Sequence, residues 1–378
     1  MKRAFSKMLL CPSCGADFGL KAFVEDERGI EEGLLRCGGC GRLAPIIRGV
    51  PRILPVYINP FLWKKHPEFF ERHDVRIPLD PPRNGFERLN RRIFEAFSYN
   101  WDAAPSFLSR RSRPARRADG GAPRGPWHAE DARIFRDNVA GLTPDFFPGK
   151  LGLDAGCNVG RHLKAARESG AEEMIGLDQT FAIDRARELL GADSGIHLVQ
   201  GSIFEFPLRP GLVDFAMCFG VVHHTPDPAA AFRVVAAAVK PGGAFLVMVY
   251  GLDEMALWYR LSHMRTLRRL TTRLPLPGIR RLCEGLAFGM KYGVVVPLSA
   301  LASVPGIGAT AKRFPFSYFR RDPVLDISRS FFDRLAPPVA THHTRREIEG
   351  WFGEAGFRDV RVTRREANAW RGTGTRAS

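Results

Sequence analysis

Four cysteines near the N-terminus form two close pairs. They are Cys11 and Cys14, then Cys37 and Cys40, and each pair has the spacing C-x2-C. Each pair can direct two thiolates at one ion, and four sulfurs fill the tetrahedral shell of a structural zinc ion without an open position for catalysis. The apolar run after Met1 is too short for an export signal, so we expect a reducing, cytoplasmic setting in which paired cysteines bind metal.

A second stretch that can do chemistry runs from Leu151 to Arg161. It reads Leu-Gly-Leu-Asp-Ala-Gly-Cys-Asn-Val-Gly-Arg: an apolar strand, an acidic residue, a turn of small residues and the start of a helix. Small residues in such a turn let a ligand lie against the backbone at the helix N-terminus. The next apolar strand ends in Asp178, where a carboxylate commonly binds the ribose hydroxyls of a nucleoside. The pattern therefore predicts a nucleoside site.

Alternating strands and helices must position these residues. We expect strands at 150–157, 173–178, 196–200, 213–219 and 244–250, and helices at 159–169, 183–190 and 228–239. The strands are nearly continuous apolar runs, as parallel strands covered on both faces require. A further helix is expected at 344–355, followed by strands at 358–362 and 369–374. The predicted fold class is α/β, a doubly wound and mostly parallel Rossmann-like sheet.

The chain divides into three predicted segments. Residues 1–57 form the zinc ribbon, 58–149 a helical and basic linker segment, and 150–378 the α/β domain. The linker holds an amphipathic helix at 86–97 and an arginine-rich loop at 109–126. Residues 252–343, inserted after the fifth strand, are expected to form a helical cover over the sheet. Prolines and charges interrupt its apolar runs, so we expect no transmembrane span, while contact with a membrane surface stays open.

The composition is ordinary except for its charge. The 378 residues are 45% apolar and 25% charged, with a formal net charge of +16. Such an excess favours an anionic partner, either nucleic acid or lipid headgroups. A solvated arginine-rich surface without such a partner explains the charge equally well.

The turn after the first strand resembles a known family. A dinucleotide site reads G-x-G-x-x-G, whereas this turn resembles the D/E-x-G-x-G-x-G motif of class I S-adenosylmethionine-dependent methyltransferases of type 11, with Asn158 at the middle glycine. Asparagine tolerates the left-handed backbone that the glycine would adopt. Three later stretches resemble family motifs in the same order: 200–207, 213–228 and 241–243. The resemblance implies S-adenosylmethionine as cofactor, bound by Asp154, Gly156, Cys157, Asn158, Gly160, Asp178, Gln179, Ser202, Ile203 and Gly220.

The resemblance also implies roles for some of these residues. The backbone at Gly156 and the carboxylate of Asp154 would bind the methionine end of the cofactor, and Asp178 the ribose. Ser202 stands where the family has the aspartate that binds adenine. Adenine would then be recognised by the Ser202 hydroxyl or the Ile203 backbone.

A narrower resemblance covers nearly the whole chain. The ribbon ends in Arg48-Gly-Val-Pro-Arg-Ile-Leu, which is similar to the zinc-ribbon activator subunit of tRNA and protein methyltransferases. Here it is fused to a methyltransferase, as in a group of bacterial proteins. The segments Phe97-Ser-Tyr-Asn-Trp101, Leu270–Pro275 and Phe332-Asp333 also resemble that group. This likeness implies an architecture rather than an acceptor.

His223 and His224 follow the fourth strand, at the sheet edge where ligands bind in such folds. Methyl transfer from a sulfonium is an in-line displacement that needs alignment and a dry site. An oxygen or nitrogen acceptor can also need a base, and histidine can act as one near neutral pH, with His224 favoured over His223. In the alternative, one imidazole packs under the cofactor and the other bonds to the turn at 225–227. Tyr99 and Trp101 are either a wall of the acceptor pocket or plain core.

Three functions are consistent with these features. The first is methyl transfer to a small or lipid-like acceptor beneath the helical cover. The second is methylation of tRNA or rRNA, suggested by the ribbon, the charge and the arginine loop. Against it, the chain lacks the Asn/Asp-Pro-Pro-Tyr/Phe tetrad, and Cys218 lies inside a strand rather than at a catalytic position. The third is a non-catalytic adenosylmethionine-binding module, which Asn158 and Ser202 permit but the intact acidic residues oppose.

Overall fold

The structure is a computed structural model that describes residues 1–102, 129–191, 193–252, 264–301, 319, 323–365 and 369–378. The predicted arginine-rich loop at 109–126 lies outside these residues. So do parts of the predicted helical cover, at 253–263 and within 302–322.

One sheet of 11 strands runs through the molecule, in the order β1-β2-β3-β4-β7-β6-β5-β8-β9-β11-β10. Its centre is parallel and consists of β5 (Leu151–Ala155), β6 (Glu173–Asp178), β7 (Ile196–Gly201), β8 (Val213–Phe219) and β9 (Val239–Tyr250). The last two strands, β10 (Phe357–Arg365) and β11 (Ala369–Arg376), are antiparallel and close one edge. The predicted α/β class with a mostly parallel sheet is therefore confirmed.

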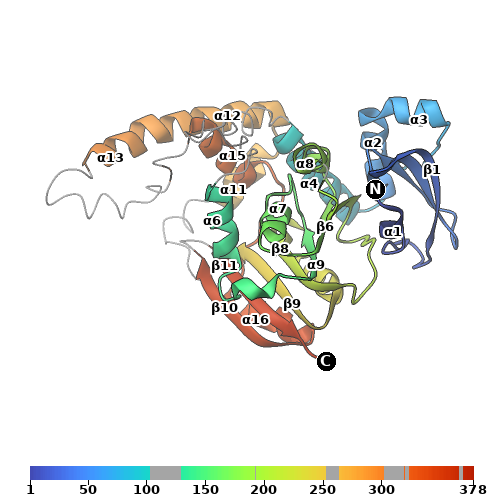
Figure 1. Ribbon diagram of the computed structural model, residues 1–378. Helices are drawn as coiled ribbons and strands as arrows, with labels where there is room; N and C mark the ends of the chain where they lie inside the picture. Colours follow the sequence, from blue (N-terminus) through green and yellow to red (C-terminus); the bar gives the residue numbers. More distant parts are fainter. Residues whose placement is uncertain (103–128, 192, 253–263, 302–318, 320–322, 366–368) are drawn as a thin grey trace, which may run out of the picture.

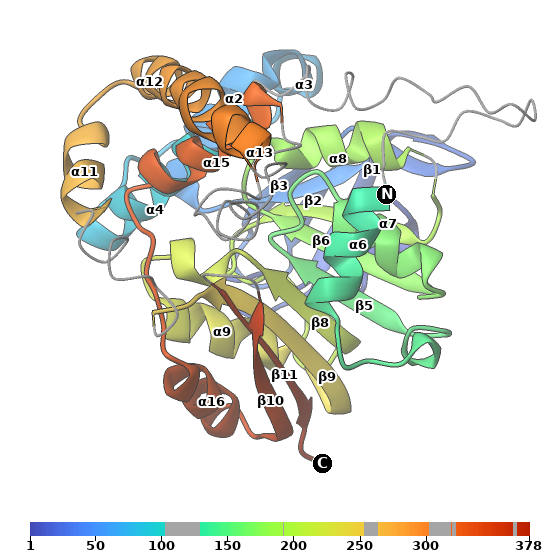
Figure 2. The same cartoon turned by 90° about the vertical axis from the view of Figure 1, so that its left-hand side faces the viewer.

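Helices cover both faces of this sheet (Figure 2). One face packs on α6 (Ala129–Asn138), α7 (Arg161–Glu168) and α8 (Ala182–Leu190), through a core that includes Phe135 and Met217. The other face packs on α9 (Pro228–Ala237) and α16 (Arg345–Glu354), through a core that includes Phe232 and Phe352. Burial on both faces explains why the central strands are continuous apolar runs.

The cysteine ribbon is an antiparallel meander that continues into the main sheet. After α1 (Arg3–Ser6) it contains β1 (Phe18–Asp26), β2 (Gly29–Cys37), β3 (Leu43–Ile47) and β4 (Val50–Ile53). β4 then pairs in parallel with β7, where Arg52 lies opposite Gln200 and Ile53 opposite Gly201. The backbone ladder thus crosses from the ribbon into the α/β sheet, a junction that the sequence did not predict.

The segment after the ribbon is mainly helical. It contains η1 (Val56–Ile58), α2 (Asn59–Lys65), α3 (Pro67–His73), α4 (Gly85–Asp102) and, after α6, η2 (Pro144–Phe146). The predicted amphipathic helix at 86–97 is the first part of α4. Phe94 of this helix is fully buried and contacts Phe181, edge to face, with ring centroids 5.4 Å apart. α4 is therefore fixed against the α/β domain.

Further helices follow β9 and extend away from the sheet (Figure 1). They are α11 (Met264–Thr271), α12 (Leu276–Met290), the π-helical turn η4 (Lys291–Val295), α13 (Val296–Leu301) and α15 (Val324–Leu335). α12 packs on α15 through Ile279 and Cys283, which meet Phe332 and Leu335 in one buried cluster. Among the described residues, no helix combines the length and apolarity needed to cross a bilayer.

Candidate cofactor and acceptor site

The turn between β5 and α7 has three residues in the left-handed region. They are Gly156 (φ 84°), Asn158 (φ 55°) and Gly160 (φ 86°). The left-handed conformation predicted for Asn158 is thus confirmed, and its side-chain Oδ1 accepts a hydrogen bond from the Val159 N–H at 2.6 Å. A Cβ at Gly156 would lie 2.3 Å from Val221, so no larger residue fits there. The backbone of the turn therefore lies directly against the loop that follows β8.

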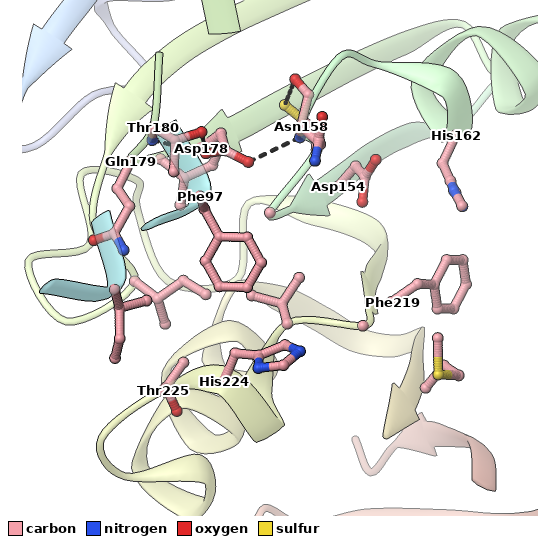
Figure 3. A pocket seen from close by; sticks show the side chains of 18 of the residues that line it. Phe97, Asp154, Asn158, His162, Asp178, Gln179, Thr180, Phe219, His224 and Thr225 are labelled. Carbon is pink, nitrogen blue, oxygen red and sulfur yellow. Dashed lines mark hydrogen bonds between the residues drawn. The ribbon is translucent and has the colours of Figure 1, made fainter. Parts of the chain in front are cut away.

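Asp178 ties this turn to the end of β6. Its Oδ2 accepts a hydrogen bond from the Asn158 N–H at 2.8 Å, and its Oδ1 accepts from the Thr180 N–H and hydroxyl at 2.8 and 2.7 Å (Figure 3). Burial raises the pKa of this carboxyl, while the three hydrogen bonds lower it. The carboxylate is therefore held rigidly at the place predicted for the ribose.

Asp154 is a buried acid at the end of β5. Burial, together with the nearby Asp178 charge, raises the pKa of Asp154 to about 8, although Arg161 opposes the shift. A buried acid with this pKa is stabilised in its charged form by a cation. The methionine end of S-adenosylmethionine carries an ammonium and a sulfonium group, so the acid fits the cofactor that the motifs indicate.

A single cavity of about 360 Å³ lies over this turn. That volume is within the range of small-molecule sites. Nine of the residues predicted to bind the cofactor line it: Asp154, Gly156, Cys157, Asn158, Asp178, Gln179, Ser202, Ile203 and Gly220.

Gly160, the tenth predicted residue, does not line the cavity. It is the residue before α7, and a Cβ there would lie 2.5 Å from a methyl group of Leu190 on α8. The glycine therefore allows α7 and α8 to pack closely beside the cofactor turn.

Other side chains that line the cavity come from α4, which precedes the central sheet, and from the C-terminal end of β9 within it. α4 contributes Phe97 and Trp101, and β9 contributes Met248 and Tyr250. Tyr99, by contrast, stacks on Phe332 with ring centroids 5.9 Å apart, in the cluster between α4, α12 and α15. The two aromatic residues singled out in the sequence thus have different places: Trp101 lines the cavity and Tyr99 is core.

The two neighbouring histidines also differ in position. Both lie in η3 (Val222–His224), but only His224 lines the cavity. His223 is fully buried, stacks on Tyr250 at 3.9 Å between ring centroids, and does not reach the cavity. In His224, Nδ1 lies 3.0 Å from the Val339 carbonyl oxygen. Because that oxygen can only accept, Nδ1 carries the proton and Nε2 keeps a lone pair.

Three further polar residues line the cavity, of which His162 directly follows the glycine turn, whereas Asn138 and Asp333 lie outside the cofactor motifs. Asp333 on α15 is partly buried; the loss of solvent raises the pKa of its carboxyl to about 6, and it accepts a hydrogen bond from the Asn100 amide at 2.7 Å. His162 packs against Phe219 with both ring nitrogens buried, and this burial lowers its pKa to about 3. Asn138 of α6 has a buried Oδ1 that accepts no hydrogen bond. The sequence pointed to Phe332-Asp333 only as a segment that resembles the group of ribbon-fused methyltransferases, without a role.

The four ribbon cysteines converge as predicted. The sulfur atoms of Cys11, Cys14, Cys37 and Cys40 all lie within 4.8 Å of one another. Gly15 and Gly41, which follow the second cysteine of each pair, have φ of 75° and 74°. A set of four thiol ligands at these separations fits a tetrahedral zinc ion.

The comparisons with known proteins include the part of the chain that carries this turn. Residues 153–247 match the protein family described as "Methyltransferase domain". S-adenosylmethionine is the methyl donor of the class that the motifs indicate, and the residues around the cavity fit it. The chain thus combines a methyltransferase domain with an N-terminal four-cysteine ribbon, as the sequence predicted.

Curated relatives act on chemically different acceptors, to judge from their names. The chain is 25% identical over 202 residues to 24-methylenesterol C-methyltransferase 2 of Oryza sativa subsp. japonica, covering 52% of this chain and 53% of the relative. It is 32% identical over 149 residues to tRNA U34 carboxymethyltransferase of Campylobacter hominis, covering 37% and 50%. It is 33% identical over 104 residues to ubiquinone biosynthesis O-methyltransferase of Bordetella bronchiseptica, covering 27% and 43%. The chain spans about half the length of the curated relatives it matches.

Proposed function

We propose that the protein transfers a methyl group from S-adenosylmethionine to a small or lipid-like acceptor. The observation that carries this proposal is one cavity lined both by the turn after β5 with Asp154 and Asp178 and by aromatic and apolar side chains of α4 and β9. A donor bound at the turn and an acceptor against the side chains of α4 and β9 would share one cavity. Binding side by side supplies the alignment that methyl transfer requires, and the apolar side chains help to keep water out.

Different residues around the cavity bind different parts of the cofactor. Asp178 accepts hydrogen bonds from the ribose hydroxyls, and Asp154 faces the ammonium group. The backbone at Gly156, Cys157 and Gly220 holds the methionine end, and Gln179, Ser202 and Ile203 surround the adenine. Bound in this way, S-adenosylmethionine supplies an electrophilic methyl group.

A base for the acceptor is available in His224. Burial lowers the pKa of His224 to about 4, so the ring is neutral at physiological pH. The hydrogen bond from Nδ1 to Val339 leaves Nε2 to take a proton from an acceptor O–H or N–H. His223 contributes by packing under Tyr250 rather than by proton transfer. Asp333 is a second candidate base, because its pKa of about 6 leaves it mostly ionised at neutral pH.

The chemical class of the acceptor is inferred from the cavity side chains that would contact it. Phe97, Trp101, Met248 and Tyr250 offer a mainly apolar and aromatic surface. Two of the three relatives described above are named for a sterol and for ubiquinone biosynthesis, and both compounds are lipids. A partly apolar acceptor is therefore favoured over a strongly charged one.

Transfer of label from the cofactor tests this proposal. The protein is incubated with methyl-labelled S-adenosylmethionine and a fractionated bacterial lysate, beside an Asp178→Ala control. We expect label in the solvent-extractable fraction with the parent and none with the control. Label in RNA instead would overturn the proposed acceptor class.

RNA methylation is the second candidate function. It is favoured by the net charge of +16 and by the similarity to a tRNA carboxymethyltransferase. The mainly apolar side chains that α4 and β9 bring to the cavity oppose it, because they favour a partly apolar acceptor. A non-catalytic binding module is the third candidate, and methyl transfer to any fraction would exclude it.

A further inference from the structure

The helices after β9 expose an apolar face that no described part of the chain covers. On α12, Ile279, Cys283 and Ala287 are buried towards α15 and Phe319. The opposite side exposes large apolar side chains, between 39% and 61% of each: Leu282, Leu286, Phe288, Tyr292 and Val296. We call these five residues the outer face of α12–α13. Most of the large apolar side chains exposed in the described residues lie between 267 and 296.

The outer face is open as well as apolar. Gly285, Gly289 and Gly293 lie among its side chains, and a Cβ at any of them would meet nothing within 4 Å. Packing within the described chain therefore gives no reason for these apolar residues. Contiguous exposed apolar side chains of this kind mark an interaction surface.

The charges around the outer face identify its partner. In the stretch 264–301, which carries the outer face, Arg269, Arg273 and Arg281 are exposed, and the one acidic residue, Glu284, pairs with Arg280 at 3.2 Å. The surface thus combines Leu and Phe side chains with an excess of arginines. A bilayer with anionic headgroups matches both features, since its interior accepts the apolar groups and its surface attracts the arginines. Phe288 and Tyr292 are residue types favoured at the membrane interface.

We propose that the outer face of α12–α13 docks on the surface of an anionic lipid bilayer. The helices lie in the interface plane, with the apolar side chains inserted below the headgroups and the arginines among the phosphates. This inference deepens the proposed function, on which it rests for its purpose: a lipid-like acceptor would be taken from the bilayer.

The position of the outer face relative to the cavity supports this purpose. α12 packs directly on α15, and α15 brings Asp333 to the cavity wall. Only one helical layer thus separates the outer face from the acceptor side of the cavity. A protein docked in this way would hold that side of the cavity near the lipid surface.

Vesicle flotation tests the inference. The full chain is mixed with vesicles of equimolar phosphatidylglycerol and phosphatidylcholine, and separately with vesicles of phosphatidylcholine alone. We expect the parent to float with the anionic vesicles and to be released as salt approaches about 1 M, where screening is strong. The Leu286→Gln/Phe288→Gln variant should bind the anionic vesicles about tenfold more weakly than the parent, because its glutamines cannot replace the apolar groups buried in lipid.

A matched control tests whether the loss of any exposed apolar side chain reduces flotation. Trp63 is 45% exposed on α2, away from these helices, so Trp63→Gln removes an exposed apolar side chain elsewhere. That control should float like the parent. Equal flotation of parent and double variant, or no flotation of the parent, would overturn the inference. Concentration-dependent dimerisation of the parent that the double variant lacks would assign the face to a second copy and overturn it as well.

Failure of the proposed function has a different signature. Binding of S-adenosylmethionine is measured on the same preparations, and it should be equal in parent, double variant and control, because none of these residues lines the cavity. Flotation without cofactor binding would uphold membrane docking and reject methyl transfer. Cofactor binding without flotation would reject membrane docking and uphold the cofactor site on which the proposed function rests.

Discussion

The guanidinium of Arg52 in the ribbon donates a hydrogen bond to the side-chain oxygen of Gln200 in the α/β sheet, at 2.8 Å. Arg52 is fully buried and also pairs with Asp184 at 2.5 Å. The Gln200 amide in turn donates to the backbone oxygens of Gln179 and Thr180, at 3.1 and 3.3 Å. The ribbon therefore buttresses the segment that follows the ribose-binding Asp178.

Replacing Arg52 should weaken both the fold and the cofactor site. In Arg52→Met, Asp184 keeps a buried charge without its guanidinium partner, which typically costs about 3–5 kcal/mol of unfolding free energy. Denaturant unfolding and titration with S-adenosylmethionine measure the two effects. The exposed bridge between Arg48 and Glu188 provides the control, since Arg48→Met should cost about 1 kcal/mol or less. Similar losses in the two variants would contradict the account.

Asp154 should make the stability of the cofactor-free protein depend on pH. Its pKa is raised from 3.8 to about 8 on folding, so its contribution is complete below pH 3.8 and is lost as pH rises through about 8. In Asp154→Asn this loss of stability is absent. Between pH 5 and 8 the unfolding free energy of the variant should therefore rise relative to that of the parent by roughly 1 kcal/mol per pH unit. Parallel stability curves for the two proteins would show that Asp154 is ionised in the folded state.

Zinc should hold the ribbon and, through it, the cofactor site. We expect one zinc ion per chain by atomic absorption, with loss of metal in Cys37→Ser. Because β4 pairs with β7, that variant should also bind S-adenosylmethionine more weakly. Cys283→Ser, in the buried cluster between α12 and α15, should keep its zinc. Full zinc content in Cys37→Ser would refute the four-cysteine site.

His224 and Asp333 can be separated by their pH dependence. If His224 is the base, His224→Gln should lower methyl transfer about 100-fold or more while cofactor affinity is unchanged. The parent rate should then be flat from pH 6 to 9, because the pKa of His224 is lowered to about 4. A parent rate that falls below pH 6, and is lost in Asp333→Asn, would assign the base to Asp333, whose pKa is about 6.

The cofactor side of the cavity was predictable because its residues are close together in sequence. Asp154 to Gly160 form one turn, and the strand ends at Asp178, Gln200 and Phe219 follow from apolar runs that stop at the same sheet edge. Even the left-handed Asn158 could be expected, since few other residues adopt that conformation.

The acceptor side was not predictable in the same way. Trp101, Asn138 and Asp333 meet only through tertiary packing of α4, α6 and α15, which are far apart in the chain. Nothing in the spacing of Tyr99 and Trp101 could show which one is core. The parallel pairing of β4 with β7 was missed for the same reason, because the sequence of a short strand does not reveal its partner.

The most direct test of the account is calorimetric titration of S-adenosylmethionine into the parent protein, Asp178→Asn and Asp193→Asn. Asp193 is an acid outside the cavity, bonded to Arg167, and serves as the matched control. We predict saturable one-to-one binding by the parent and by Asp193→Asn. In Asp178→Asn the affinity should fall about 10- to 100-fold, as expected when charged hydrogen bonds to the ribose are lost. Equal affinity in all three proteins, or no binding by the parent, would contradict the assignment of this cavity to the methyl donor.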